Sequence, residues 1–438
     1  MLSHSLTDAA QLSGARCNSQ SSTESGKAPT SSAHRVPENN IGFPHSWRNL
    51  SFSVTVHTDS AALTDYSGAL DELARSSSEP NIFYEPWMLL PSLKAFGQER
   101  SFAFVLIFGQ QAGKPPLLCG FFPLEITERH RGIPVRTATL WTYLHYYWCP
   151  PLIREGCEHQ SLRALFEWMR SEQTPCSLIE FGSMPAEGPM ARALIDVVNE
   201  LKLQRYVWEL YTRALLRRAG DAETCIRRAL PGRRLKELNR VRRRLAEKGT
   251  LSFEELTPAG NLTEWLEGFL ALEARGWKGG AGTALASTEG KRQFFLESAR
   301  AAFARGRLMM MRLRLNGRAI AYKCNFLSGR GAFAFKIAYD EEYSSYSPGV
   351  HLELENVRCF HAMPGMEWMD SCADPDHFMA NHLWSDSRAI QTTAVAVRGR
   401  LSGLLLAAFP LLKWAKRTLM PAAPPAEIKN TTEMKDTV

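Results

Sequence analysis

Three residues in the C-terminal part of the chain are of types that transfer protons in enzymes: Lys336, Asp370 and His377. Lys336 lies in an otherwise apolar stretch, where burial would lower the pKa of its ammonium group towards that of a useful base. Asp370 lies at the end of an expected strand, where site residues of α/β proteins commonly occur. We therefore predict that these three residues are the catalytic candidates.

The same residues also have structural interpretations. A lysine within a strand can point to solvent or lie at a sheet edge, and an aspartate that ends a strand can cap the next helix. His377 precedes His382 in a segment that also contains Asp374 and Asp376. Two histidines at this spacing do not share one helix face and no cysteine pair accompanies them, so we predict no metal site.

Between Lys336 and Asp370 lies a turn of the kind that begins a helix, Ser347-Pro348-Gly349. A serine hydroxyl can accept a hydrogen bond from an amide of the first turn, and proline suits the first helical position. Glycine leaves the backbone open to a ligand. Because a helix N-terminus presents unpaired N–H groups and a positive dipole end, this turn can hold a phosphate group. An ordinary strand-to-helix connection is the alternative interpretation.

Aromatic residues gather at two places. Residues 141–148 read WTYLHYYW, and we predict Tyr146 and Tyr147 as substrate contacts because aromatic faces suit stacking on sugars or acyl chains. Trp277 lies beside a glycine-rich stretch that suits a lid over a site, and it is the third predicted substrate contact. The alternatives are a strand that fills a large core and, for Trp277, an anchor between two helices.

The elements that must position these residues follow one order that occurs twice, with a strong hairpin signal at Asn316-Gly317. In the second half we expect a strand at 251–256, helices at 262–274 and 290–305, strands at 307–315, 318–327 and 331–339, a helix at 348–362, a strand at 367–372, a helix at 375–384 and a strand at 389–397. In the first half we expect a strand at 52–57, helices at 61–75 and 83–96, strands at 101–109, 117–127 and 137–147, a helix at 161–171, a strand at 177–182, a helix at 190–201 and a strand at 204–210.

This architectural repeat predicts an α/β protein with two domains, at 49–212 and 250–400. Residues 1–48 have the polar composition of a disordered arm. We expect a basic linking helix at 213–249, and an apolar, basic helix with a tail at 401–438.

Positive charge is concentrated in the linking segment. The net charge of the chain is +7, while residues 227–248 alone hold ten Lys or Arg and two Glu. Apolar residues recur there at helical spacing, so one face is apolar and the other carries the arginines. Such a helix can bind nucleic acid, an anionic membrane or an anionic substrate, or can bridge two domains in solvent. Because no nucleic-acid reader motif accompanies the charge, nucleic acid is disfavoured.

The nine cysteines are scattered without a Cys-x-x-Cys pair, which indicates reduced thiols and a cytoplasmic protein. The N-terminal residues lack the apolar core of a secretory signal. Residues 401–419 are apolar but shorter than the roughly 20 residues that span a bilayer. Their tryptophan and basic residues favour a peripheral contact with the inner membrane, and a helix docked on the sheet is the alternative.

Several short motifs together resemble the GNAT acetyltransferases of the CelD/BcsL type, which are linked to cellulose and exopolysaccharide biosynthesis. The motifs are NIFYEPW at 81–87, RLKELNRVRRRLAEKG at 234–249, LEARGWKGG at 272–280, AIA at 319–321, KIAYD at 336–340, SPG at 347–349 and DSCA at 370–373. The order of elements is also the GNAT order. The resemblance covers roughly residues 51–397 and is specific as a combination.

The resemblance implies tandem GNAT-like domains, each a mixed, mainly antiparallel sheet flanked by helices, as in Fem-type transferases. It implies acetyl-CoA or another acyl-CoA as donor, bound along strand 331–339 and at the following turn. The donor-binding residues carried over are Ala338, Tyr339, Ser347, Pro348, Gly349 and Val350. The implied acceptor is a sugar- or lipid-linked amine or hydroxyl in envelope or exopolysaccharide synthesis, which attacks the thioester directly.

The expected phosphate loop departs from the GNAT pattern, because residues 343–349 read YSSYSPG and contain a single glycine. Two alternatives therefore stay open. A Fem-like aminoacyltransferase would use aminoacyl-tRNA, held by the basic helix. A non-catalytic scaffold would have lost CoA binding and would tether a polysaccharide synthase.

Overall fold

The computed structural model describes residues 50–171, 174, 176–399, 402–404 and 406–408. The predicted disordered arm at 1–48 lies outside this part of the chain, as does most of the predicted C-terminal helix and tail at 401–438. Within the described residues, no helix combines the length and the apolar character that crossing a membrane requires.

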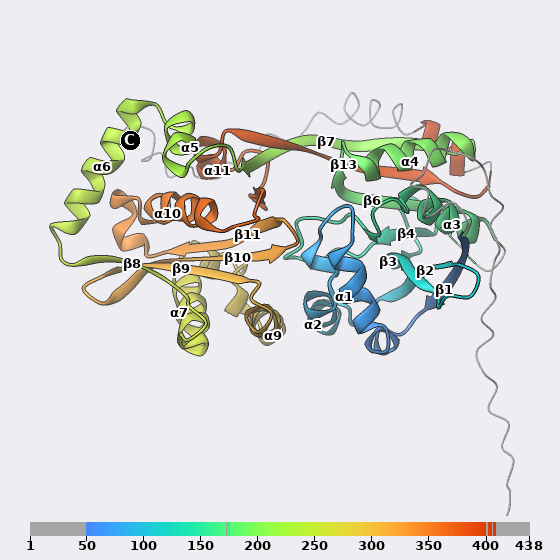
Figure 1. Cartoon of the computed structure of the whole chain (residues 1–438), viewed down its shortest axis with the longest axis horizontal. Helices are drawn as coiled ribbons and strands as arrows, with labels where there is room; N and C mark the ends of the chain where they lie inside the picture. The colour runs from blue at the N-terminus through green and yellow to red at the C-terminus, as the bar shows by residue number, and fades with distance from the viewer. Residues whose placement is uncertain (1–49, 172–173, 175, 400–401, 405, 409–438) are drawn as a thin grey trace, which may run out of the picture. The chain divides into compact units, whose positions relative to one another are not determined.

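One sheet joins the described strands in the spatial order β1-β2-β3-β4-β6-β13-β7-β12-β11-β10-β9-β8, with β5 paired to β3 (Figure 1). The pairs β4–β6 and β11–β12 are parallel, and the others are antiparallel. The strands are β1 (Ser51–His57), β2 (Ser101–Gln110), β3 (Leu117–Thr127), β4 (Thr137–Leu140), β5 (Leu152–Ile153), β6 (Leu178–Pro185), β7 (Gln204–Arg217), β8 (Leu251–Glu255), β9 (Leu308–Leu315), β10 (Arg318–Ser328), β11 (Gly331–Tyr339), β12 (Trp368–Asp370) and β13 (Asp386–Ala396).

The helices occur between the strands in the predicted order, which confirms the mixed α/β fold class. The α-helices are α1 (Ser67–Arg75), α2 (Pro86–Phe96), α3 (Glu158–Arg170), α4 (Pro189–Glu200), α5 (Ala222–Ala229), α6 (Gly232–Ala246), α7 (Leu262–Arg275), α8 (Trp277–Gly280), α9 (Glu289–Ala304), α10 (Pro348–Ala362) and α11 (Phe378–Leu383). Short 3-10 helices are η1 (Ser60–Thr64), η2 (Ile82–Tyr84), η3 (Leu285–Ser287) and η4 (Glu341–Tyr346).

Two predicted elements differ from the structure for identifiable reasons. The strand expected at 137–147 ends at Leu140, because β5 occupies the edge of β3 at Gly120 and Phe121 and leaves no partner for a longer β4. The linking helix is broken into α5 and α6 at Pro231, which cannot donate the backbone hydrogen bond that a continuous helix needs.

The last described strand is shared between the two halves of the sequence. β13 lies between β6 and β7, both of which come from the first half, and it pairs with β7 along its whole length. β7 extends to Arg217, beyond the expected end at residue 210, and its last residues pair with β12. The two halves therefore build one continuous sheet, and this sheet holds loops of the first half against the second.

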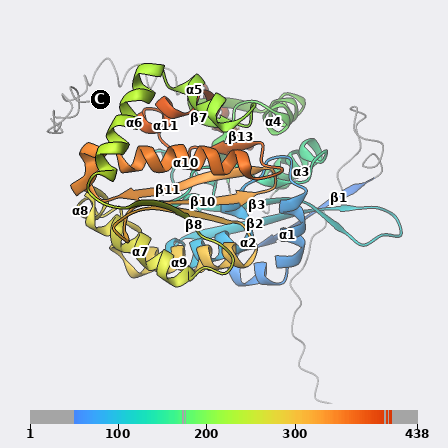
Figure 2. The same ribbon diagram turned by 60° about the vertical axis from the view of Figure 1, so that its left-hand side comes forward.

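Helices cover both faces of the second half of the sheet. Figure 2 shows α7 and α9 on one face of β8–β11 and α10 on the other. α2 of the first half packs against α9 in the same layer. Aromatic residues from both halves meet in this layer, as in the edge-to-face pair of Phe96 and Phe294 with ring centroids 5.3 Å apart.

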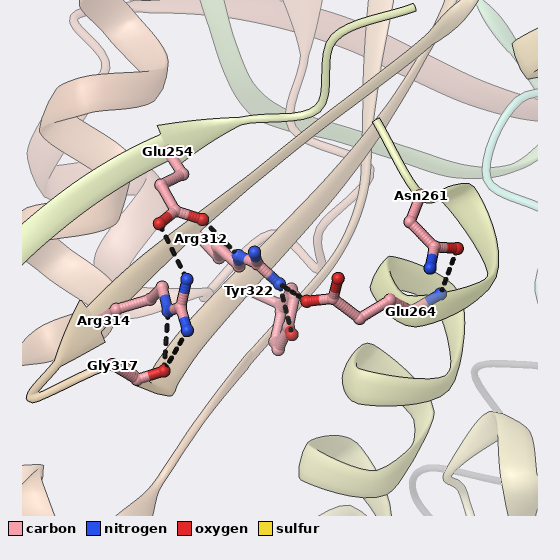
Figure 3. A network of polar contacts seen from close by, with 7 residues as sticks. All are labelled: Glu254, Asn261, Glu264, Arg312, Arg314, Gly317 and Tyr322. Carbon is pink, nitrogen blue, oxygen red and sulfur yellow. Dashed lines mark hydrogen bonds and ion pairs between the residues drawn. The ribbon is translucent and has the colours of Figure 1, made fainter. Parts of the chain in front are cut away.

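A buried arginine ties the outer strands of the second half to α7 (Figure 3). The Arg312 guanidinium, on β9, donates to Glu254 of β8 at 2.7 Å and to Glu264 of α7 at 2.6 Å. It also lies over the Trp265 ring, 4.2 Å from the centroid. Arg312 is 7% exposed, so its charge depends on these partners rather than on water.

We predict that Arg312→Met lowers the free energy of unfolding by about 1–3 kcal/mol, because two charge-assisted hydrogen bonds are lost. Arg314→Met is the matched control, since Arg314 also bonds Glu254 but its side chain is 30% exposed. That control should cost less than about 1 kcal/mol. Urea unfolding of both variants measures the difference, and equal losses would contradict a special role for Arg312.

Candidate functional site

The parallel strands β11 and β12 pair over three residues only and then diverge. Gly331 to Phe333 face Trp368 to Asp370, and no further pairing between these strands is described. A cavity of about 350 Å³ opens beyond this point. Its walls come from β11, the loop after β12, α8, α11 and a loop of the first half, so both halves contribute to it.

A bulge lies in β11 where the cavity begins. Cys324 of β10 pairs with Lys336 of β11, and Phe326 pairs with Phe333. One residue lies between the two paired positions of β10 but two lie between those of β11, so β11 contains one extra residue. An extra residue re-aims the neighbouring side chains. Phe335 and Lys336, which are consecutive, both reach the layer of α7 and α9: Phe335 stacks with Phe295 at 6.5 Å, and Lys336 Nζ lies 3.6 Å from Glu273 Oε1.

Beyond the bulge, β11 presents an open backbone edge to the cavity. The Asp340 N–H donates to the Ile320 carbonyl at 2.8 Å. In an antiparallel pair only every second residue bonds to the neighbouring strand, so this bond shows which residues of β11 bond to β10. In this alternation the N–H and C=O of Ile337 point away from β10, towards the gap left by β12. Lys278 Nζ, on α8, donates to the Ile337 carbonyl at 2.8 Å.

Two lysines of the cavity share one buried carboxylate. Lys336 Nζ and Lys278 Nζ lie 3.6 and 3.7 Å from Glu273 Oε1, and Glu273 Oε2 accepts a hydrogen bond from the Leu285 amide at 2.8 Å. Burial lowers the pKa of Lys336. Burial and the nearby Lys336 charge lower the pKa of Lys278 to about 8. Both lysines can therefore supply a neutral amine more readily than an exposed lysine.

A second ion pair lies on the opposite side of the sheet. Lys323 Nζ of β10 contacts Glu353 Oε2 of α10 at 2.8 Å, and both side chains are almost fully buried. Glu353 also accepts hydrogen bonds from Asn356 at 2.7 Å and from the Trp384 indole at 3.1 Å. These bonds satisfy the carboxylate, so we interpret the pair as a structural part of the wall.

The first half supplies the wall opposite β11. His145 and Tyr147 line the cavity, whereas Tyr146 does not. Burial and the charge of Lys336 lower the pKa of His145 to about 3, so its ring is neutral at physiological pH. The Tyr147 carbonyl accepts a hydrogen bond from Arg213 at 2.6 Å, which fixes this loop to β7.

The predicted catalytic residues have different environments. Lys336 and His377 line the cavity, together with the predicted substrate contact Trp277. His377 Nδ1 also accepts a hydrogen bond from the Ala380 amide at 3.3 Å and so caps α11. Asp370 is fully buried outside the cavity lining.

Asp370 is the centre of a buried ion-pair cluster. Its Oδ1 lies 2.8 Å from Arg213 Nε and accepts from the Cys372 amide at 2.9 Å, and its Oδ2 accepts from Arg388 at 3.0 Å. The Arg388 guanidinium lies between the rings of Trp148 and Trp368, at 4.6 and 4.2 Å. This cluster holds the end of β12 in place, and the loop that follows β12 forms part of the cavity wall.

The predicted donor-binding turn is partly as expected. Pro348 is the first residue of α10, as predicted. The predicted cap by the Ser347 hydroxyl is wrong: Ser347 has a left-handed backbone (φ 50°) that follows from the preceding η4, and its side chain makes no capping bond. Its carbonyl instead accepts from Val350 at 3.0 Å, and a Cβ added to Gly349 would lie 3.2 Å from Tyr339.

Two of the predicted donor-binding residues, Ala338 and Tyr339, are the last residues of β11. Ala338 and Tyr339 line a small cavity of about 20 Å³ that shares Trp277, Lys278 and Ile337 with the large one. Tyr339 continues into a third cavity of about 180 Å³. Residues 347–350 line none of these three cavities, and their contact with the donor stays a prediction.

Sequence reasoning missed Glu273, Lys278, Lys323, Glu353 and His145. A signal existed for Glu273, which lies four residues after Phe269 and seven after Leu266 on the buried face of α7. An acidic residue on an apolar helix face indicates a buried partner. Among the described residues, no group of histidine, cysteine or acidic side chains has the arrangement of a metal site.

Part of the chain matches a known domain family, and the solved structure of FemX shares its fold. A family model described as the acetyltransferase (GNAT) domain matches residues 232–378. The crystal structure of FemX superposes with a TM-score of 0.52 at 9% identity, over 80% of this chain and 99% of that chain. A conserved protein of unknown function from Bacteroides thetaiotaomicron VPI-5482 gives a TM-score of 0.49 at 10% identity, over 79% and 100%. A search of curated proteins found no match.

A tandem GNAT protein from the clavulanic acid biosynthesis pathway also superposes, with a TM-score of 0.40 at 13% identity, over 79% of this chain and 100% of that chain. The family match includes β11, the bulge, Lys278, Lys336 and the turn before α10. On the match to the family model, residues 232–378 form a GNAT acetyltransferase domain, and the protein is an acyltransferase. The likeness to FemX shows the fold alone, and the finer CelD/BcsL assignment rests on the sequence motifs.

We predict that Asp370→Asn unfolds the protein early rather than only slowing it. The change removes the carboxylate that pairs with the buried Arg213 and with Arg388, whose side chain is 15% exposed, which should cost about 3–5 kcal/mol. Asp386→Asn is the control, because Asp386 pairs at 3.3 Å with Arg228, whose side chain is 47% exposed. Thermal melting compares the two. Unchanged melting with a large loss of turnover would instead make Asp370 a catalytic residue.

Proposed function

We propose that this GNAT acyltransferase transfers an acyl group, with acetyl as the first candidate, from CoA to a sugar- or lipid-linked amine or hydroxyl in envelope or exopolysaccharide synthesis. The observation that supports the donor most is the cavity at the divergence of β11 and β12, two strands that lie within the segment that matches the GNAT domain. The acceptor class rests on the resemblance to the CelD/BcsL type.

The donor's arm has a suitable partner in the edge of β11. The pantetheine arm of CoA is narrow and carries amide groups, and an extended chain with amides can add to a strand edge by backbone hydrogen bonding. Ile337 presents such an edge inside the large cavity. The pyrophosphate would then meet the N-terminus of α10, where the amide of Gly349 and the helix dipole favour an anion.

The reaction in this site is direct attack of the acceptor on the thioester carbonyl. The acceptor nitrogen or oxygen forms the new bond to the acyl carbon, and the carbon–sulfur bond breaks to release CoA as a thiol. The attacking group must lose a proton, and we propose Lys336 as its base, because Lys336 lines the cavity and burial lowers the pKa of its side chain. The neutral amine would accept this proton and then pass it to the departing thiolate. Backbone N–H groups at the edge of β11 would stabilise the oxyanion.

The first half of the chain would hold the acceptor. Residues 144, 145 and 147 of its loop line the cavity near Lys336, and His145 is neutral there. Trp277 also lines the cavity and is 62% exposed. Two aromatic residues in the lining suit the apolar face of a sugar or a lipid chain.

We predict that Lys336→Met lowers turnover about a hundredfold while CoA affinity changes little, since only the proton acceptor is lost. Turnover of the wild type should rise with pH as Lys336 loses its proton, and this rise should disappear in the variant. Lys94→Met is the control, because Lys94 lies outside the lining of this cavity and pairs with Glu297 through a side chain that is 71% exposed. Steady-state kinetics over a pH series measure both effects, and an unaltered pH profile in Lys336→Met would exclude this lysine as the base.

We predict that Gly349→Asp weakens CoA binding at least tenfold, or about 1.4 kcal/mol, because a carboxylate would face the pyrophosphate. Isothermal titration calorimetry with acetyl-CoA and longer acyl-CoAs gives the affinities, and thermal melting shows whether the fold survives. Unchanged affinity would remove the pyrophosphate from this turn. A wild-type chain that binds no CoA would overturn the acyl-CoA proposal.

Aminoacyl transfer from tRNA is the second candidate, and the position of α6 favours it. Arg234 of α6 lies over the ring of Phe378, 5.4 Å from its centroid, next to His377 at the cavity. A basic helix at the rim can hold a polyanion beside the site, whether tRNA or an anionic membrane with a peripheral contact. Binding of the full chain to tRNA and to anionic vesicles can be measured separately. Weaker binding in Arg234→Glu and at higher salt would support the corresponding contact. Equal binding to neutral and anionic vesicles would exclude an electrostatic contact with the membrane.

A further inference from the structure

The Lys278 side chain is bonded to the backbone carbonyl of β11 that the proposed donor needs as a hydrogen-bond acceptor. Its ammonium group donates to the Ile337 carbonyl at 2.8 Å, and this carbonyl belongs to the open edge of β11. A strand edge of this kind is normally completed by another strand or by a ligand with amide groups. Here a side chain from a different element completes it.

The segment that carries Lys278 is held by a few polar contacts. α8 has four residues, and the Trp277 amide donates to Glu341 Oε1 at 2.6 Å. At its other end, Lys291 Nζ donates to the Gly282 carbonyl at 3.0 Å. No residue of α8 is buried, so packing does little to fix its position.

A second partner for Lys278 is already in place. Glu273 Oε1 lies 3.7 Å from Lys278 Nζ, and the Glu273 side chain is fully buried. Among the described residues this oxygen is within hydrogen-bond distance of no donor, while the other oxygen of the carboxylate is bonded to Leu285. A buried carboxylate oxygen without a hydrogen bond is unfavourable, so a small shift of the Lys278 ammonium would satisfy it.

We propose that Lys278 is a displaceable residue of the donor site: an amide N–H of the donor's arm replaces its ammonium on the Ile337 carbonyl, and the ammonium moves to Glu273 Oε1. This inference rests on the proposed acyl-CoA function. Lys278 thus determines which donors bind, because only an arm with an N–H at this position replaces the hydrogen bond that is lost.

The displacement would also prepare the base. Glu273 is shared between Lys278 and Lys336 at similar distances, and its charge raises the pKa of Lys336 against the larger, opposite effect of burial. A direct contact between the Lys278 ammonium and Glu273 would offset the negative charge of Glu273 and so weaken its effect on the pKa of Lys336. Lys336 then loses its proton more readily, so donor binding favours the form of Lys336 that accepts a proton from the acceptor.

The chain offers variants that separate displacement from simple bracing of α8. Lys278→Met removes the competing ammonium and keeps most of the side-chain length. Lys291→Met removes the equivalent lysine-to-carbonyl hydrogen bond at Gly282 but leaves the β11 edge as it is. Isothermal titration calorimetry of the full chain with CoA compares both variants with the wild type.

The expected result is that Lys278→Met binds CoA about fivefold more tightly than the wild type, as the loss of one competing hydrogen bond implies, while Lys291→Met is unchanged. Equal or weaker binding by Lys278→Met, with CoA bound by the wild type, would overturn this inference and leave the proposed function standing. Failure of both proteins to bind CoA would overturn the proposed function as well.

Hydrogen exchange gives an independent test. On addition of CoA, exchange of the amides of Ile337 and Tyr339 should slow, because the arm covers this edge. Exchange of the amides at 279–284, several of which bond to carbonyls of Trp277 and Lys278, should become faster as α8 is released. Slower exchange at both places would show that CoA tightens α8 on β11 and would contradict displacement.

Discussion

The short pairing between β11 and β12 is the feature on which the site depends. Parallel strands that stayed paired would close the sheet and bury the backbone of both. Here the pairing ends after Phe333 and Asp370, and the bulge in β11 turns Phe335 and Lys336 towards one layer at the same point. The open edge of Ile337, the cavity and the position of Lys336 all follow from this divergence.

The exchange of strands between the halves explains why the first half takes part in the site. Because β13 lies between β6 and β7, and β7 reaches β12, the loop at 144–147 is held over the cavity by the same sheet that contains β11. The Asp370 cluster strengthens this junction, since its partners Arg213 and Arg388 come from β7 and β13. The loop opposite Lys336 is therefore bonded, through Arg213, to the same sheet that contains the strand with Lys336.

Local patterns predicted most of the fold. The bounds of β11 and α10 follow from an apolar run and from a proline at the first helical position, both of which act over a few residues. Lys336 could be proposed as a site residue because a lysine in such a run is unusual. Tyr147 and Trp277 also line the cavity, whereas Tyr146 does not.

The remaining features depend on long-range geometry. The bulge in β11 exists only in register with β10, and the Lys278–Glu273–Lys336 group joins three elements that are distant in sequence. Asp370 was expected at a strand end, but its partners Arg213 and Arg388 come from β7 and β13. The position of these strands near β12 cannot be predicted from local sequence. Ser347 lost its expected capping role because η4, just before it, imposes a left-handed backbone.

The central claim is that an acyl-CoA arm lies along β11 with its thioester at Lys336. A crystal structure of the full chain with acetyl-CoA tests this most directly. We predict an arm hydrogen-bonded to the backbone of Ile337, with the acyl carbon in the cavity between Lys336 and the loop at 144–147. An arm bound elsewhere on the protein, with this cavity unchanged, would contradict the claim.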